Sequence, residues 1–536
     1  MQVRTYWTTQ LLAYCLLATL FGASYVTNDV REQHPRILRI ISTDDGHYHA
    51  RVKAALLHRW GEVRNGVTGG EHPAIGGPPA IVETVVGGAF SWTTLKAPQV
   101  MMLLTIFLTP CIVFLLCGLL RKSGMGEWWS IVGMTAYLLV FMGPLQKPVN
   151  MSLSIPITVA ALLTLQWAYQ SPRLIPVLVC GAIIGVLPAV YFWSWTFVWA
   201  STAIFFLLHL FSVPGSTRKR AQTIALCSVL FLTSLISLPF LLDMLHSSKM
   251  DPNFAATALR STIVLTHAIE SIPRTILLTV LLFSTILLVR RSGSSSQQSW
   301  LLPLAALLGI FVCMYQNVIH AVRFTFSSHY YPFVCLAALL IGIWACAHAK
   351  KGSLRFVVVG LASIFLLAGL WDYRSVWDIV RGEYYVRNIQ HLSPALHNLD
   401  DGVRQTVLTD KTSAHMVTTW TDDDVVYTAY IKHLLISDEE YAERYCLSEM
   451  FSPAGPDLLW LSREVVETGD SAEIERRRAQ FAAICAPVRQ HPRTFLKKYG
   501  IDLILWNERL HPEWHIPSSY TLRSRGTDWS LWVAPL

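Results

Sequence analysis

Apolar residues gather into long runs over residues 1–371, and short polar segments separate one run from the next. Each run is near the roughly 20 residues that an α-helix needs to cross a bilayer. From Asp372 onward the charged residues become dense and the runs stop. The pattern predicts a polytopic α-helical membrane domain over residues 1–371 and a soluble domain over residues 372–536.

The hydropathy predicts about eleven transmembrane helices. Their approximate bounds are Trp7–Val26, Gln99–Leu120, Trp128–Gly143, Met151–Tyr169, Leu174–Phe192, Trp195–Phe211, Ala221–Leu242, Thr275–Val289, Trp300–Val318, Pro332–His348 and Leu354–Leu370. The first run is read as a retained span and not as a signal peptide, because its apolar core is long and no small-residue cleavage pattern follows it. The stretch "YFWSW" between the fifth and sixth runs predicts a tight turn.

Basic residues agree with this count, because cytoplasmic loops of membrane proteins carry an excess of Lys and Arg. With a cytoplasmic N-terminus, the predicted cytoplasmic loops hold Arg121-Lys122, Arg173, Arg218-Lys219-Arg220, Arg290-Arg291 and Lys350-Lys351. This topology predicts a protein integral to the plasma (inner) membrane, with two long outer loops (27–98 and 243–274) and an extracytoplasmic C-terminal domain. The loops account for the net charge of +8, so we expect membrane lipids and no nucleic acid among the partners.

The soluble segment alternates strand patterns with helix patterns. "RQTVLTD" and "IDLILWN" read as short buried strands. "SAEIERRRAQFAAICAPV" and "PRTFLKKYG" read as helices, the second ended by Gly500. We therefore expect a small α/β domain. Its two cysteines, Cys446 and Cys485, are able to pair outside the cytoplasm, but their spacing leaves the pairing open.

The stretch "STDDGHYHARVKAALLHRWG" follows the first predicted span. One acid is enough to cap the helix that begins here, so Asp44 and Asp45 together leave one carboxylate without a structural task. Ionisable groups at a membrane are costly and commonly functional. Val52 and Ala55 share one helical face with basic residues around it, which predicts a short amphipathic helix in the headgroup plane.

"DDGHYHAR" resembles the first-loop motif of the GT-C superfamily of membrane glycosyltransferases, in particular that of the catalytic subunit of oligosaccharyltransferase. Asp45, Tyr48, His49 and Arg51 match the motif residue by residue. The predicted architecture is also similar to that family, with a cytoplasmic N-terminus, a long first outer loop, a similar number of spans and an extracytoplasmic C-terminal domain.

The resemblance implies a sugar donor linked to a polyprenyl phosphate or diphosphate, with Asp45 as general base on the acceptor and Asp44 assisting. A hydroxyl becomes a good nucleophile when a positioned carboxylate takes its proton. The residues of the motif that we expect to bind substrate are His47, Tyr48, His49 and Arg51.

Three residues of later outer loops are further candidates for substrate binding. Arg323, in "HAVRFTFSSHYYPF", resembles the Arg-aromatic element that GT-C enzymes place before a late span, and a cation there would stabilise the leaving phosphate. An Arg that snorkels to lipid headgroups is the alternative. His329 flanks Arg323. Glu270, in "TIVLTHAIES", is a partial match to the element with which oligosaccharyltransferases bind a peptide acceptor, and a solvated Glu is the alternative.

Two departures from the oligosaccharyltransferase pattern favour a hydroxyl as the acceptor group. The outer loop "GPLQKPVNM" holds no acid where that family has a metal-binding carboxylate pair, and "WDYR" at Trp371 lacks the tandem Trp and the Gly of the peptide-binding motif. A divalent cation (Mg or Mn) at Asp45 is a candidate cofactor, although such cations prefer several oxygen ligands. A glycan, a lipid or a protein would carry the acceptor group.

Two alternatives stay open: oligosaccharyltransferase-like transfer to protein asparagine, and a non-enzymatic transporter or glycan-assembly membrane protein. Transporters tend to have internal repeats and broken spans with charges at the midplane. The sequence has no evident repeat, and its predicted spans are almost free of acids and bases. A glycosyltransferase with a lipid-linked sugar donor is therefore the favoured prediction.

Overall fold

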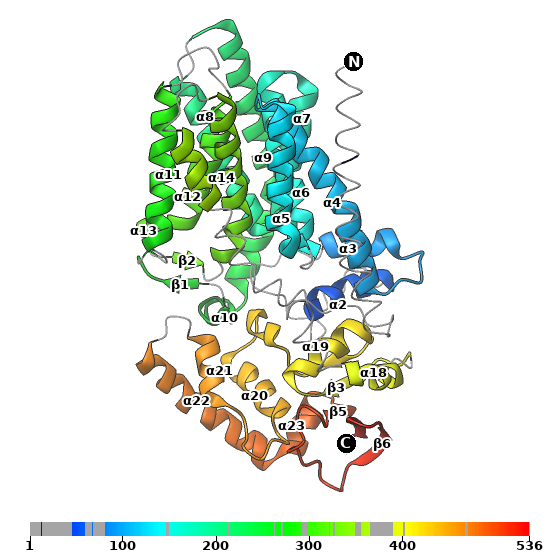
Figure 1. Cartoon of the computed structure of the whole chain (residues 1–536). Helices are drawn as coiled ribbons and strands as arrows, with labels where there is room; N and C mark the ends of the chain where they lie inside the picture. Colours follow the sequence, from blue (N-terminus) through cyan, green and yellow to red (C-terminus); the bar gives the residue numbers. More distant parts are fainter. Residues whose placement is uncertain are drawn as a thin grey trace.

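The structure, a computed structural model, describes residues 12, 45–58, 67, 81–145, 149–212, 215–261, 263–267, 269, 272–291, 299–320, 322–324, 327–348, 355–364, 390–399, 402–466 and 470–534. These residues form a mostly helical molecule with a small sheet. A bundle of long helices makes up one half, and a domain of shorter helices and strands makes up the other (Figure 1).

The bundle is built from apolar helices. They are α4 (Ala97–Lys122), α5 (Glu127–Leu145), α6 (Val149–Gln170), α7 (Leu174–Val190), α8 (Phe192–Ser212), α9 (Thr217–Met250), α11 (Ile272–Arg291), α12 (Leu301–Tyr315) with the short α13 (Asn317–His320), α14 (Tyr331–His348) and a helix over 355–364. α7 packs against α9, α8 against α12, and α4 against α6. Their common core includes Leu116, Leu165, Ile184, Leu307 and Trp344, all buried.

These helices coincide with the runs that the hydropathy predicts, apart from Trp7–Val26, of which only Leu12 is described. The expected turn is present, because α7 ends at Val190 and α8 begins at Phe192. Among the described residues, two segments, Phe192–Phe211 and Thr217–Asp243, are long and apolar enough by length and composition to cross a membrane. The count of about eleven spans stays a prediction.

α9 turns many of its apolar side chains away from the protein. Ile224, Phe231, Leu235 and Leu238 are exposed along its length. An exposed apolar stripe of this length suits contact with lipid better than contact with water. A membrane location is therefore indicated for the bundle. α9 also continues to Met250, so the first residues of the expected second outer loop are helical.

The C-terminal domain has the expected α/β architecture. Its sheet has the order β4-β3-β5-β7-β6, in which β3 is parallel to β4 and β5, and β7 is antiparallel to β5 and β6. The strands are β3 (Thr406–Leu408), β4 (Asp424–Val425), β5 (Leu503–Asn507), β6 (Thr521–Arg525) and β7 (Trp529–Val533). The two strands expected from the sequence are β3 and β5.

Helices surround this sheet. They are α18 (Ser393–Leu399), α19 (Lys411–Trp420), α20 (Asp438–Ser448), α21 (Leu458–Val465), α22 (Ser471–Gln490) and α23 (Pro492–Lys498), with the 3₁₀ helices η3 (Gln390–Leu392) and η4 (Ala429–His433). α22 and α23 are the two helices expected from the sequence. Gly500 follows α23 with a φ of 58°, the left-handed conformation that glycine favours after a helix. Cys446 of α20 and Cys485 of α22, whose pairing the sequence left open, form a disulfide with Cα atoms 5.6 Å apart.

Several short elements belong to the predicted outer loops. They are α2 (Asp45–Leu56), α3 (Ile81–Phe90), α10 (Phe254–Ser261), β1 (Ile263–Leu265), β2 (Val322–Phe324) and η2 (Ser327–Tyr330). One of them, α2, contacts both α4 of the bundle and α19 of the C-terminal domain. α2 and α10 lie at the level where the bundle meets the C-terminal domain (Figure 1). We call this layer the junction. Val67 of the predicted first outer loop also pairs with Val425 of β4 and is buried in the core of the C-terminal domain. The predicted domain boundary at Asp372 lies outside the described residues.

Candidate functional site

One acid of the predicted first outer loop, Asp45, stands at the start of α2. The helix begins at Asp45, while Asp44 lies outside the described residues. His47, Tyr48, His49 and Arg51 follow within the first two turns of the same helix. Residues three and four apart are neighbours on a helix surface. Asp45, Tyr48 and His49 therefore share one face of α2.

α2 is not the exposed interfacial helix that the sequence predicts, because protein covers its apolar face. Val52 and Ala55 are buried, and α2 packs against α3, α4 and α19. Gly87 of α3 allows the close approach, since a side chain there would meet Ala55 and the backbone of α2. The amphipathic pattern thus reflects packing at the junction and not contact with headgroups.

A buried ion pair joins α2 to α3. Nη1 of Arg51 lies 3.3 Å from Oε1 of Glu83, and the two side chains are 3% and 1% exposed. The guanidinium keeps the buried carboxylate compensated, and loss of either partner would leave a buried charge. Arg51, predicted to bind substrate, thus has a protein partner on α3, and its predicted role is untested.

Lys53 fastens α2 to the C-terminal domain. Its Nζ donates to the carbonyl oxygen of Thr418, at 3.2 Å, and to that of Thr421. It also lies 3.8 Å from Oδ1 of Asp422. These carbonyls end α19, where backbone oxygens lack helical partners and a cation is favourable.

His49 is buried at the junction with an unsatisfied nitrogen. The residue is 5% exposed, and its Nδ1 has no hydrogen-bond partner among the described residues. Burial, helped by the charge of Lys53, lowers the pKa of His49 to about 3. The imidazole is therefore neutral near pH 7. A neutral imidazole is able to donate one hydrogen bond and to accept another.

Arg323 lies in a two-stranded sheet that joins two outer loops. β1 and β2 are antiparallel, with Val264 opposite Arg323. Asn317 donates to the carbonyl of Thr266 at 3.1 Å, which fastens the same two loops. The structure thus joins the loop of Arg323 to the second outer loop. Glu270 lies outside the described residues.

His329 belongs to an aromatic cluster at the turn between α7 and α8. Its Nδ1 is hydrogen-bonded to the hydroxyl of Tyr191, and the two rings are stacked. The ring of Trp193 lies 5.5 Å from His329 and 4.8 Å from Tyr330. The turn between α7 and α8 and the helix η2 thus hold His329 in one orientation.

Rings of the C-terminal domain continue toward α2. Tyr48 meets Tyr430 of η4 edge to face, with centroids 6.2 Å apart. Tyr430 lies 4.9 Å from His433 of the same 3₁₀ helix. Burial, together with the nearby charges of Lys432, Arg260 and His329, lowers the pKa of His433 to about 3.

Sequence reasoning missed several of these residues. Glu83 has no distinguishing context in the sequence, because its partner lies on another helix. Tyr430 and His433 stand in "AYIKH", which matches no motif. The stretch "YFWSW", which holds Tyr191 and Trp193, predicts a tight turn but not a contact with His329. This aromatic turn was the one feature of the sequence that could have indicated the aromatic cluster around His329.

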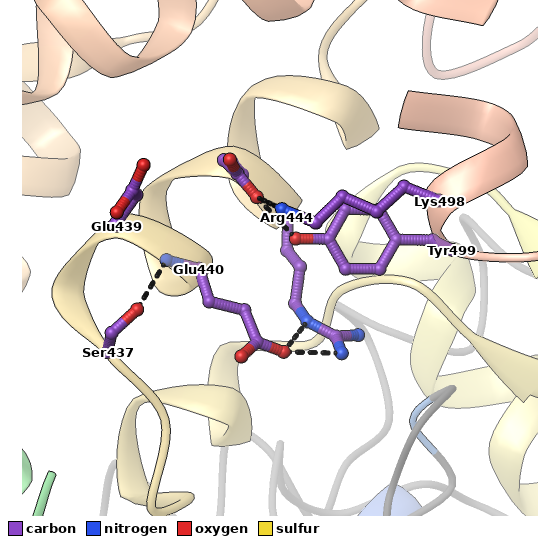
Figure 2. Close-up of a pocket in the computed structure, with 7 residues that line it drawn as sticks. Ser437, Glu439, Glu440, Arg444, Lys498 and Tyr499 are labelled. Carbon is purple, nitrogen blue, oxygen red and sulfur yellow. Dashed lines mark hydrogen bonds and ion pairs between the residues drawn. The ribbon is translucent and has the colours of Figure 1, made fainter. Parts of the chain in front are cut away.

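A pocket of about 440 Å³ lies in the C-terminal domain (Figure 2). Its lining residues are Ser437, Glu439, Glu440, Glu443, Arg444, Lys498 and Tyr499. Glu443 accepts hydrogen bonds from Lys498 and Tyr499 at 2.5 and 2.6 Å, and Arg444 pairs with Glu440. Structural ion-pair networks have this character. No residue singled out from the sequence lines this pocket, so the candidate site is the junction.

A divalent cation was a candidate cofactor at Asp45. Within the described ranges, no three His, Cys, Asp or Glu residues come together as a metal-binding group. Mg²⁺ and related cations want several oxygen ligands. The described residues do not fit such a cation.

No family model matches the sequence, and no curated protein matches it. Among solved structures, the chain is similar to ArnT from Cupriavidus metallidurans in the apo state, with 12% identity and a TM-score of 0.46 over 99% of this chain and 98% of that one. It is also similar to the archaeal oligosaccharyltransferase AglB from Archaeoglobus fulgidus in complex with an inhibitory peptide and a dolichol-phosphate. That match has 10% identity and a TM-score of 0.47 over 95% of this chain and 70% of that one.

Both similarities are distant, at 10% and 12% identity. At these TM-scores the similarity carries no argument about the activity of this chain.

Proposed function

We propose that this protein is an integral membrane glycosyltransferase. It moves a sugar from a polyprenyl phosphate or diphosphate to a hydroxyl of an acceptor on the extracytoplasmic side, with Asp45 as general base. The observation that carries the proposal is the fixation of α2 at the junction. Arg51 ties the helix to α3, and Lys53 ties it to α19. An acid at the start of this helix is thereby supported from both halves of the molecule.

The chemistry asks for a base, a cation and a held sugar. The Asp45 carboxylate takes the proton of the acceptor hydroxyl as its oxygen attacks the anomeric carbon. The bond from that carbon to the phosphate oxygen of the lipid breaks, and the leaving phosphate keeps the electron pair. Arg323, on a strand held by β1, is the proposed cation that stabilises this charge. Neutral His49, on the same face of α2 as Asp45, is a hydrogen-bonding partner for the acceptor.

The proposed topology has about eleven spans, a cytoplasmic N-terminus and an extracytoplasmic C-terminal domain over residues 372–536. The disulfide between Cys446 and Cys485 supports it, because disulfides persist in oxidising compartments and are rare in the cytosol. The attachment of α2 and α10 to the C-terminal domain also supports it, since both belong to the predicted outer loops.

The test is sugar transfer by the purified full chain from radiolabelled polyprenyl-phosphate sugars, with wild type beside Asp45→Asn. We expect the rate to fall at least about a hundredfold in the variant, which is what loss of a general base costs. Asp243→Asn is the matched control, because Asp243 is an exposed acid of the same predicted side, on α9. It should turn over at the wild-type rate.

Equal rates for wild type and Asp45→Asn would exclude Asp45 as the base. If the wild type transfers no sugar from any donor but transports one of them across a sealed vesicle, the glycosyltransferase proposal fails and the transporter alternative takes its place.

A further inference from the structure

A band of rings crosses the junction from α2 to η2. It consists of Tyr48, Tyr430, His433 and His329, and we call it the ring band. Tyr48 contacts Tyr430, and Tyr430 contacts His433, at the centroid distances given above. His329 is near enough to His433 for its charge to affect that imidazole. Two of the four rings come from the C-terminal domain.

The backbone of η4 dictates which residues it presents. A 3₁₀ helix has three residues per turn, so positions i and i+3 lie above one another. Ile431 and Leu434 are buried in the core and anchor η4. Tyr430 and His433, also three residues apart, are only partly buried. The same period therefore places these two rings together on another edge of η4.

α10 holds η4 rigidly. Arg260 donates to the carbonyl oxygens of Lys432 and Leu434, each at 3.1 Å, and its side chain is 1% exposed. A clamp on the residues that flank His433 limits the freedom of that ring. At the other end of the band, Tyr191 and Trp193 fix His329. Rings whose orientation is set in advance bind a ligand at lower entropic cost.

The position of the ring band indicates its ligand. In the proposed reaction the anomeric carbon lies between the base and the leaving phosphate. The ring band runs between the helix that begins with Asp45 and η2, which closely follows the strand of Arg323. The sugar of the donor must occupy that interval. Aromatic and imidazole rings suit it, because they pack against the C–H face of a sugar and hydrogen-bond its hydroxyls.

We infer that Tyr430 and His433 of the C-terminal domain complete the binding site for the donor sugar, a role that rests on the proposed function. The C-terminal domain is then part of the active centre and not only a cover. Tyr430 supplies a ring face, and the neutral His433 supplies a hydrogen bond to a sugar hydroxyl.

The experiment separates the sugar from its lipid. The purified full chain in nanodiscs is titrated calorimetrically with farnesyl phosphate and with farnesyl-phosphate-linked glucose, mannose, galactose, arabinose and N-acetylglucosamine. In the wild type at least one sugar should raise the affinity over farnesyl phosphate alone. Tyr430→Ala and His433→Ala should each lose about tenfold in affinity for that sugar-lipid. Their affinity for farnesyl phosphate should not change.

Two variants serve as controls. Tyr430→Phe keeps the ring and should retain most of the affinity. His397→Ala removes an exposed histidine of α18 outside the ring band and should bind as the wild type does. A melting temperature equal to that of the wild type establishes that each variant is folded.

The inference is overturned if Tyr430→Ala and His433→Ala bind the sugar-lipid as the wild type does, or if no sugar adds affinity to the wild type. The proposed function fails separately. If the ring variants lose the sugar-dependent affinity but the wild type transfers no sugar to any acceptor, the sugar site stands and the transferase falls. If Asp45-dependent transfer occurs with an unchanged KM for the donor in both ring variants, the transferase stands and the inference falls.

Discussion

α10 and α2 both dock onto the C-terminal domain, but they do so in different ways. α10 carries Arg260, every side-chain nitrogen of which is used. Nε donates to the carbonyl of Lys432, Nη1 pairs with Asp438 at 2.6 Å, and Nη2 donates to the carbonyls of Leu434 and Ile436. The N–H donors of Arg260 and the carbonyl and carboxylate acceptors around it are therefore paired with one another.

α2 has a buried side-chain nitrogen without a hydrogen-bond partner among the described residues. Lys53 is committed to α19, but buried His49 keeps an unsatisfied Nδ1 among the described residues. Native proteins rarely bury such an atom without a reason. The comparison indicates that α10 is a structural fastening, whereas α2, in the proposed function, combines a fastening with chemistry.

The largest effect is expected at Arg260. Arg260→Ala removes the hydrogen bonds to three carbonyls of the C-terminal domain, of which those of Leu434 and Ile436 keep the hydroxyl of Thr257, and it removes one partner of Asp438. Because Asp438 keeps Arg477 as a second partner, the cost comes mainly from the lost hydrogen bonds of the buried guanidinium and is about 3 kcal/mol. We expect that loss in the free energy of unfolding, measured as a lower melting temperature and as faster proteolysis of the C-terminal domain.

The matched control is Arg477→Ala. Arg477 pairs with the same Asp438 at 2.5 Å, but its side chain is 21% exposed, and such pairs are worth about 1 kcal/mol or less. If both variants have the same small effect, the junction does not depend on α10, and α10 is not the stronger of the two attachments to the C-terminal domain.

The second prediction concerns acid and His49. The folded pKa of His49 is about 3, below the ordinary value of 6.5, so the unfolded chain binds a proton that the folded chain refuses. Stability is therefore complete above pH 6.5 and falls as the pH decreases toward 3. For His49 alone the loss at pH 5 is about 2 kcal/mol. His49→Leu lacks the imidazole and therefore this loss of stability. As the pH is lowered from 7 to 5, its melting temperature should rise relative to that of the wild type.

Two other groups set the background of that experiment. His415 and His433 are also held neutral by burial, with pKa values of about 4 and 3, so both proteins still lose stability in acid. Only the difference between the two curves reports on His49. Parallel curves would mean that solvent reaches the His49 imidazole in the folded protein.

Local patterns in the sequence predicted the elements of both halves. The apolar runs predicted the bundle helices, and alternating patterns predicted β3, β5, α22 and α23. Each of these signals lies within one segment of the chain, where a period of 3.6 or 2 residues is readable.

The junction was not predictable in the same way, because its contacts join distant segments. The pairing of β1 with β2 rests on two strands of three residues, too short for a periodic signal. The partner of Glu83 comes from α2, and that of Tyr48 comes from η4. The motif residues Asp45, Tyr48, His49 and Arg51 were found by resemblance, but their surroundings became visible only in the folded chain.

The smallest effect is expected at Lys53, and it distinguishes two physical causes. Nζ of Lys53 serves the carbonyls that end α19 and also lies near Asp422, whose side chain is 31% exposed. A partly exposed ion pair contributes little and weakens with salt, whereas hydrogen bonds from a cation to carbonyls persist. Lys53→Met keeps the apolar stem and should cost about 1 kcal/mol of stability, measured as a drop in melting temperature. The size of the drop should be the same in about 0.05 M NaCl and in about 1 M NaCl, where the screening length is only about 3 Å. Asp422→Asn is the control and should cost only a few tenths of 1 kcal/mol of stability. A salt-dependent loss of equal size in both variants would assign the fastening of α2 to the ion pair, and α2 would then be held by a contact much weaker than that of α10.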